Sequence, residues 1–219
     1  LAKKRTAVCR MANVANCQVI PVDMGVLDFP PTEGVLDRRI GNATGDISQE
    51  PAMTREQAAK AVLTGIQLVA QQKEQGVHLL ATGEMGIGNT TTSSAVACVL
   101  LSREASQLTG RGAGLSREGL ERKIRVVEQA ISRNRPDPED PLDVISKVGG
   151  FDIAGLCGVF LGGAIHGVPV LIDGFISAIA ALCAVRMCPK AEKALLASHV
   201  SAEPAGRMVL DALQLQPLI

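Results

Sequence analysis

The sequence contains no tryptophan or tyrosine and only four phenylalanines, so aromatic side chains make up 2% of its 219 residues. Proteins that bind single-stranded nucleic acid use stacking aromatic rings beside a basic groove. Here the 22 Lys and Arg residues are balanced by 22 Asp and Glu residues, which leaves a formal net charge of zero. We therefore expect no nucleic-acid partner, and a core built from Leu, Val, Ile and Ala.

Cysteine and histidine give no sign of a metal site. The six cysteines are scattered, and no pair has Cys-x-x-Cys spacing. Most lie in apolar stretches, which is typical of reduced, buried cysteines in a cytoplasmic protein. The three histidines, His78, His166 and His199, are far apart in the sequence. We expect no metal and no cofactor, and we interpret the histidines as structural.

One long run without charges, Ile153–Ile172, is long enough to cross a bilayer. Several glycines and Pro169 interrupt it, however, and it divides naturally into a helix ending at His166 and a strand over 168–172. We expect a buried helix–strand–helix unit, completed by a helix over 175–185, rather than a membrane span.

Strand and helix patterns alternate along the chain. Apolar, β-branched runs predict strands over 6–8, 18–23, 77–80, 168–172 and 198–201. A capping box at Thr54 and a possible cap at Ser116 begin two of the intervening helices. This alternation predicts an α/β, Rossmann-like fold with a mainly parallel sheet and helices on both faces.

The stretch over 81–92 lies between a predicted strand and a predicted helix. Gly83, Gly86 and Gly88 allow backbone to approach a ligand, and a helix N-terminus attracts anions. Asn89, Thr90 and Thr91 could cap the helix. The lysine of a P-loop is absent, and the dinucleotide fingerprint lacks its third small residue. We predict an anion site with Glu84 beside it; a glycine connection without a ligand is the alternative.

Other polar residues fall where strands end. Asp23 and Asp173 each lie close to a glycine at a predicted strand end, the usual place of α/β ligand sites. For Asp23, a turn cap is an equal alternative. Ser201 either binds phosphate or caps the last helix. Arg38 and Arg39 lie in a long loop and could pair with an anion.

Four motifs together resemble those of the bacterial nicotinate-nucleotide–dimethylbenzimidazole phosphoribosyltransferases of cobalamin synthesis. They are Gly83–Thr92, Gly110–Gly114, Gly149–Gly155 and Ser198–Pro204, in the right order, and the resemblance extends over all 219 residues. It implies transfer of the 5-phosphoribosyl group from nicotinate mononucleotide to 5,6-dimethylbenzimidazole, in a cytoplasmic homodimer. It also implies a small helical domain built from both chain ends, which takes the helix from about 202 onward; the rest of 1–219 forms one Rossmann-like domain.

The resemblance also assigns site residues. Glu84 matches a supporting glutamate, Met85 a residue that touches the aromatic base, and Gly86, Gly88, Asn89, Thr90 and Ser201 the phosphate region. Asp152 and Asp173 are weaker matches. The family's general base is a glutamate in a loop after the last helix, so we expect it beyond Ile219, and we expect the family's N-terminal segment before Leu1. The alternatives are a related enzyme acting on another nucleotide, or a non-catalytic nucleotide-binding and dimerisation core.

Overall fold

The computed structural model describes residues 1–219 and divides them into two units, Leu1–Thr44 and Gly45–Ile219. The first unit holds helix α1 (Ala7–Val14) and two short strands, β1 (Val22–Asp23) and β2 (Leu36–Asp37), which pair in parallel. The strand predicted over 6–8 is wrong, because these residues begin α1. Apolar residues recur there at helical spacing, and this pattern outweighs the β-propensity of Thr6 and Val8.

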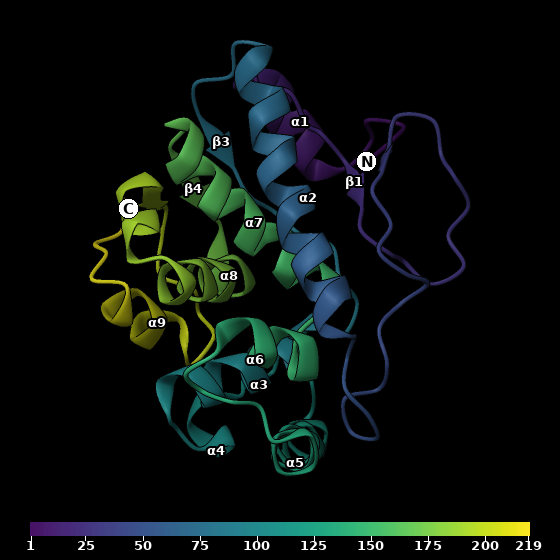
Figure 1. Cartoon of the computed structure of the whole chain (residues 1–219), viewed down its shortest axis with the longest axis vertical. Coiled ribbons are helices and arrows are strands. Elements are labelled where there is room, and N and C mark those ends of the chain that lie inside the picture. The colour runs from purple at the N-terminus through teal and green to yellow at the C-terminus, as the bar shows by residue number, and fades with distance from the viewer. The chain divides into compact units, whose positions relative to one another are not determined.

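The second unit contains the larger sheet, drawn with its covering helices in Figure 1. Three short strands lie in the order β3-β4-β5 and are all parallel; they are β3 (Leu80–Ala81), β4 (Val170–Ile172) and β5 (Leu195–Ala197). The helices are α2 (Arg55–Glu74), α3 (Asn89–Leu101), α4 (Ala105–Leu108), α5 (Arg117–Asn134), α6 (Pro141–Val148), α7 (Phe151–His166), α8 (Gly174–Met187), the 3-10 helix η1 (Pro189–Ala194) and α9 (Gly206–Ala212). The predicted α/β class with parallel strands is confirmed.

Two strand predictions need correction. The last strand ends at Ala197, so the predicted strand over 198–201 is instead the loop that follows it. The strand before the glycine stretch is not buried: Ala81 in β3 is exposed, and Leu79 beside it is 55% exposed. The central strand β4 buries Val170 and Ile172, and β5 buries Leu195 and Ala197.

Helices α2 and α7 run alongside each other and pack at unusually close range (Figure 1). A Cβ at Gly65 would lie 2.1 Å from the carbonyl oxygen of Gly155, and one at Gly158 would lie 2.0 Å from that of Val62. The glycine spacing of α7 therefore lets two backbones touch.

The predicted capping box is present at the start of α2, where Thr54 and Gln57 accept hydrogen bonds from each other's backbone N–H groups.

The charge-free run over 153–172 forms most of α7 together with β4, as predicted. Its interior residues, among them Ile153, Cys157 and Phe160, are fully buried within the chain. None of the helices combines the length and the apolar character that crossing a membrane would need.

Candidate active site

The loops after β3, β4 and β5 all leave the sheet on the side where the carboxyl ends of its parallel strands lie together, which is the sheet edge meant from here on. Hydrogen bonds tie these loops to one another. The Thr82 hydroxyl donates to the Leu171 carbonyl at 2.8 Å and lies in hydrogen-bond contact with the Ser177 hydroxyl. The Ser198 hydroxyl donates to the Ile172 carbonyl at 2.6 Å. The loops that carry Glu84, Asp173 and Ser201 are thus held together at this edge.

The first turn of α3 is the centre of this edge. Gly88 is its N-cap and adopts a left-handed conformation with φ of +86°, which an L side chain rarely adopts. The capping predicted for Asn89, Thr90 and Thr91 is wrong, since no side chain caps the helix. The N–H groups of Asn89 and Thr90 meet no acceptor in the chain. Free N–H groups and the helix dipole favour an anion here.

Two carboxylates lie on one side of this turn and share a single amide donor. The buried Asn89 side chain donates from Nδ2 to Glu84 Oε2 at 2.5 Å and to Asp152 Oδ2 at 2.8 Å. Glu84 Oε2 also accepts from the Gly86 N–H at 3.1 Å. Asn89 therefore serves as a bridge that holds two acidic groups near each other, rather than as a helix cap.

Close backbone surrounds the Asp152 carboxylate. A Cβ at Gly86 would lie 2.6 Å from Asp152 Oδ2, and one at Gly150 would lie 2.5 Å from Oδ1. Burial raises the pKa of Asp152 above its ordinary value, and the charge of Glu84 acts in the same direction. Hydrogen bonds from Asn89 and from the Ile153 N–H oppose this shift only in part. The pair therefore favours a state in which one carboxyl keeps its proton or a cation lies between them.

A lysine lies on the other side of the same turn. Lys123, on α5, is only 6% exposed, and its Nζ donates to Thr90 Oγ1 and to the Gly110 carbonyl, each at 3.0 Å. An ammonium group has three N–H donors, so one remains for a ligand. The first turn of α3 thus combines free N–H groups with a cation on one flank and carboxylates on the other.

The remaining predicted residues occupy the same edge in different ways. Met85 is 77% exposed and free to contact a ring. Asp173 begins α8 without capping it, and its side chain is exposed. The Ser201 hydroxyl accepts from the Glu203 N–H at 3.3 Å, but the predicted cap of the last helix is wrong, because the N-cap of α9 is Ala205 and no side chain caps it. No set of three or more His, Cys, Asp or Glu side chains is arranged to hold a metal ion.

In the first unit, Asp23 caps a turn. Its Oδ1 accepts from the N–H groups of Gly25 and Val26, each at 2.9 Å, and its Oδ2 pairs with Arg39 Nε at 2.7 Å. Burial pushes the pKa of Asp23 upward, but the hydrogen bonds and the Arg39 charge outweigh it and hold the pKa below its ordinary value. The turn-cap interpretation of Asp23 is confirmed.

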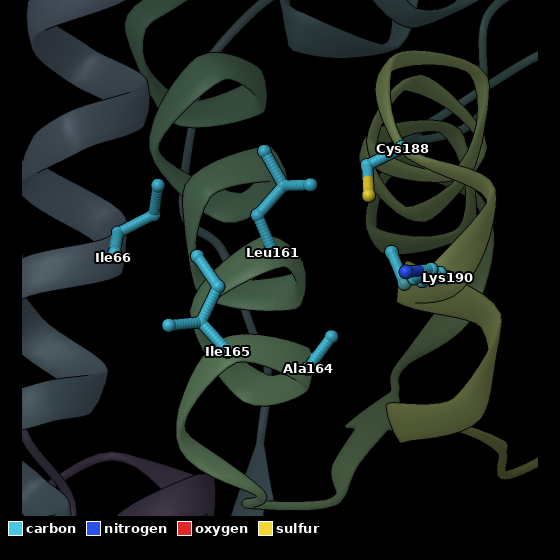
Figure 2. A pocket seen from close by; sticks show the side chains of 7 residues that line it. Ile66, Leu161, Ala164, Ile165, Cys188 and Lys190 are labelled. Carbon is cyan, nitrogen blue, oxygen red and sulfur yellow. The ribbon is translucent and has the colours of Figure 1, made fainter.

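A separate apolar groove of about 330 Å³ lies between α2, α7 and η1 (Figure 2). Leu161, Ala164 and Ile165 line it from α7, with Ile66 on α2 and Cys188 and Lys190 at the opposite wall. It contains no carboxylate and no imidazole. Leu161 is roughly 14 Å along α7 from Asp152, at 1.5 Å per residue. The groove therefore lacks the carboxylates that lie close together at the sheet edge, and we place the candidate active site at that edge.

Comparison with known proteins identifies the family. A family model described as phosphoribosyltransferase matches residues 1–219. The chain belongs to this phosphoribosyltransferase family. A member from Acetivibrio thermocellus, named nicotinate-nucleotide–dimethylbenzimidazole phosphoribosyltransferase, is 52% identical over 214 residues, which are 98% of this chain and 61% of the relative. A protein of the same name from Ruminiclostridium cellulolyticum is 49% identical, with the same shares covered.

Solved structures of the family agree in fold. The crystal structure of CobT from Thermus thermophilus matches with a TM-score of 0.94 at 38% identity, covering 100% of this chain and 66% of that chain. A second structure from that organism, of nicotinate-nucleotide–dimethylbenzimidazole phosphoribosyltransferase, has a TM-score of 0.91 at 36% identity, covering 99% of this chain and 64% of that one. The chain spans 61% of the length of the curated relatives named above.

Sequence reasoning did not single out Lys123 as a site residue. The signal was present, because Lys123 follows Leu120 by three residues and precedes Val127 by four. That spacing puts the lysine within the apolar stripe. A charge inside such a stripe indicates either a stem lying along the surface or a buried ammonium with partners. The structure shows the second.

Proposed function

We propose that this chain carries the phosphoribosyl-transfer site of a nicotinate-nucleotide–dimethylbenzimidazole phosphoribosyltransferase. The reaction would move the 5-phosphoribosyl group from nicotinate mononucleotide to 5,6-dimethylbenzimidazole, with inversion at the anomeric carbon, and would give α-ribazole 5′-phosphate and nicotinate. The names of the relatives support this proposal. The observation that carries it is the first turn of α3, with a cation on one flank and two carboxylates on the other.

The cationic flank suits the phosphate. A phosphate dianion would accept hydrogen bonds from the free N–H groups after Gly88 and from the third N–H of Lys123. The helix dipole favours negative charge at the same position. The hydroxyl of Thr90 accepts from Lys123 and can donate its own proton to a phosphate oxygen. Ser201, on the loop after β5, belongs to the same predicted phosphate region. We propose that these groups fix the 5-phosphate and thereby orient the ribose.

The acidic flank suits positive charge that develops in the reaction. The bound nicotinate is a pyridinium until it leaves, and the transition state at the anomeric carbon has oxocarbenium character. A carboxylate held by a buried amide is preorganised to stabilise such charge. We propose that Glu84 supplies this stabilisation, with Asn89 and Asp152 fixing its position, and that the exposed Met85 packs against the benzimidazole ring.

The incoming benzimidazole must lose its N–H proton, and this step needs a base. Glu84 Oε2 already accepts hydrogen bonds from the Gly86 N–H and from Asn89 Nδ2, so we assign this oxygen a supporting role and not the removal of a substrate proton. The assignment of the general base to a segment beyond Ile219 stays a prediction.

Turnover separates the candidate functions. The chain of 219 residues, and a version extended at both ends by the corresponding segments of a relative, are incubated with nicotinate mononucleotide and dimethylbenzimidazole while nicotinate release is followed. We expect the extended version to form product. We expect the 219-residue chain to bind nucleotide with turnover lower by a factor on the order of 10²–10⁴, because we predict that the added C-terminal segment carries the base. Equal rates would place the base within 1–219. Nucleotide binding without product in both versions would favour a non-catalytic core, and no binding would refute the site.

The same proposal includes a homodimer, a cytoplasmic location, and one Rossmann-like domain over 1–219 whose last helix belongs to a small domain. The apolar region over 153–185 is mostly buried within the chain, so an interface would use exposed apolar side chains such as Leu63 and Ile165. Light scattering at increasing protein concentration tests this. A monomer at every concentration would contradict it.

A further inference from the structure

The turn over Gly110–Gly112 lies directly against the carboxylate of Glu203, a residue that no step of the proposed reaction uses. Glu203 Oε1 accepts a hydrogen bond from the Gly112 N–H at 3.0 Å. A Cβ at Gly110 would fall 1.7 Å from Glu203 Oε2 and 2.6 Å from Pro204 Cδ. The backbone of the turn and the carboxylate are therefore in contact, with no room for a side chain at Gly110.

The opposite side of this turn touches the proposed phosphate site. The Gly110 carbonyl accepts from Lys123 Nζ at 3.0 Å. Gly112 has a φ of +53°, and a Cβ there would lie 2.9 Å from Thr90 Oγ1. The turn is thus held between Glu203 and the first turn of α3, and it needs glycine at both positions.

Glu203 is itself well fixed. Its N–H donates to the Ser201 hydroxyl at 3.3 Å, and its carbonyl accepts from the Gly206 N–H at 2.8 Å. These bonds attach it to the segment that leads from β5 into α9. A displacement of this segment would therefore pass to the Gly110–Gly112 turn.

Charge connects Glu203 to Lys123 as well. Glu203 Oε2 is buried without a hydrogen-bond partner, an arrangement that is costly for a carboxylate unless a cation is close. Burial lowers the pKa of Lys123, and the negative charge of Glu203 acts in the opposite direction. Glu203 thus helps a buried ammonium group to stay charged.

We propose that Glu203 is a positioning residue of the phosphate site, which holds the Gly110–Gly112 turn and, through it, the Lys123 ammonium where the nucleotide phosphate binds. Glu203 acts through its neighbours and does not touch the substrate. The inference rests on the proposed function, because it takes nicotinate mononucleotide as the ligand.

Two substitutions in the full chain separate the hydrogen bond from the charge. Glu203→Ala removes both, and we expect its Kd for nicotinate mononucleotide, measured by calorimetry at pH 7, to rise at least about tenfold. Glu203→Gln keeps a carbonyl oxygen for the Gly112 N–H, and we expect its Kd to stay within about threefold of the unmodified chain. Glu139→Ala, at an exposed glutamate in the loop before α6, is the matched control and should change nothing.

Two further readouts distinguish positioning from a general structural role. Hydrogen exchange at the Gly112 N–H should accelerate in Glu203→Ala and stay slow in Glu203→Gln. Glu203→Gln should also lose nucleotide affinity at a lower pH than the unmodified chain, because Lys123 then lacks the charge that supports its protonation.

The outcomes are distinct. A Kd in folded Glu203→Ala within about twofold of that of the unmodified chain would overturn the proposal. The proposal would also be overturned if nucleotide affinity fell over the same pH range in Glu203→Gln and in the unmodified chain as pH is raised. If Glu203→Ala does not fold, the pH comparison with Glu203→Gln decides alone. Absence of nucleotide binding in the unmodified chain would overturn the proposed function together with this inference, whereas failure of the Glu203 tests alone leaves the proposed function standing.

Discussion

Replacing Lys123 with methionine tests the phosphate site most directly. Methionine has nearly the same length, fits an apolar stripe and removes only the ammonium group. In the structure Lys123 is 6% exposed, and its ammonium group keeps one N–H donor beside the first turn of α3. A hydrogen bond to a charged group contributes about 1.5–3 kcal/mol. At about 1.4 kcal/mol per tenfold, the Kd for nicotinate mononucleotide should rise by roughly 10- to 150-fold.

Stability should change much less than affinity. The substitution leaves Thr90 Oγ1 and the Gly110 carbonyl without a donor and the Glu203 carboxylate without its nearby cation, but it also removes a desolvated positive charge whose burial is unfavourable. These two effects oppose each other. We therefore expect the free energy of unfolding, measured by urea titration, to change by no more than about 1 kcal/mol.

Calorimetry with two ligands provides the assay. The loss of affinity in Lys123→Met should be large for nicotinate mononucleotide and absent for the riboside that lacks the phosphate. Lys60→Met, at an exposed lysine on α2, is the matched control and should bind both ligands as the unmodified chain does. Equal losses for the two ligands, or unchanged binding of the mononucleotide, would refute the assignment of Lys123 to the phosphate.

Two further predictions concern stability. The raised pKa of Asp152 means that the folded chain keeps this proton at pH values where the unfolded carboxyl, with a pKa of about 3.9, has lost it, so stability falls as pH rises through this window. Asp152→Asn should therefore raise the melting temperature at pH 8 but not at pH 4. A lower melting temperature of the variant at pH 8 would contradict this prediction. Gly65→Ala should destabilise the chain by about 2–3 kcal/mol in urea titration, because its Cβ would lie 2.1 Å from the Gly155 carbonyl oxygen. Gly119→Ala is the control: its Cβ would meet nothing closer than 3.3 Å, so stability should change by less than about 1 kcal/mol. Equal effects of the two substitutions would be inconsistent with close packing of α2 on α7.

Much of this protein follows from local pattern. The capping box at Thr54 and the glycine turn before Asn89 are local features, so the sequence predicts correctly that one helix begins after Thr54 and that another follows the glycine turn. The charge-free run over 153–172 divides at Gly167 as predicted, because glycine there adopts the left-handed conformation that ends α7. Motif order was also enough to indicate the family.

Other features depend on contacts between segments distant in the sequence. The burial of β4 and the exposure around β3 depend on how the strands and helices pack together, which local pattern does not encode. Asn89 has the chemistry of a helix cap, yet its amide bonds Glu84 and Asp152, and the second of these lies 63 residues away. Lys123 and Glu203 gain their roles only when α5 and the loop after β5 meet the Gly110–Gly112 turn. Periodicity and turn chemistry act over a few residues, whereas the pairing of buried charges is decided by packing across the whole fold.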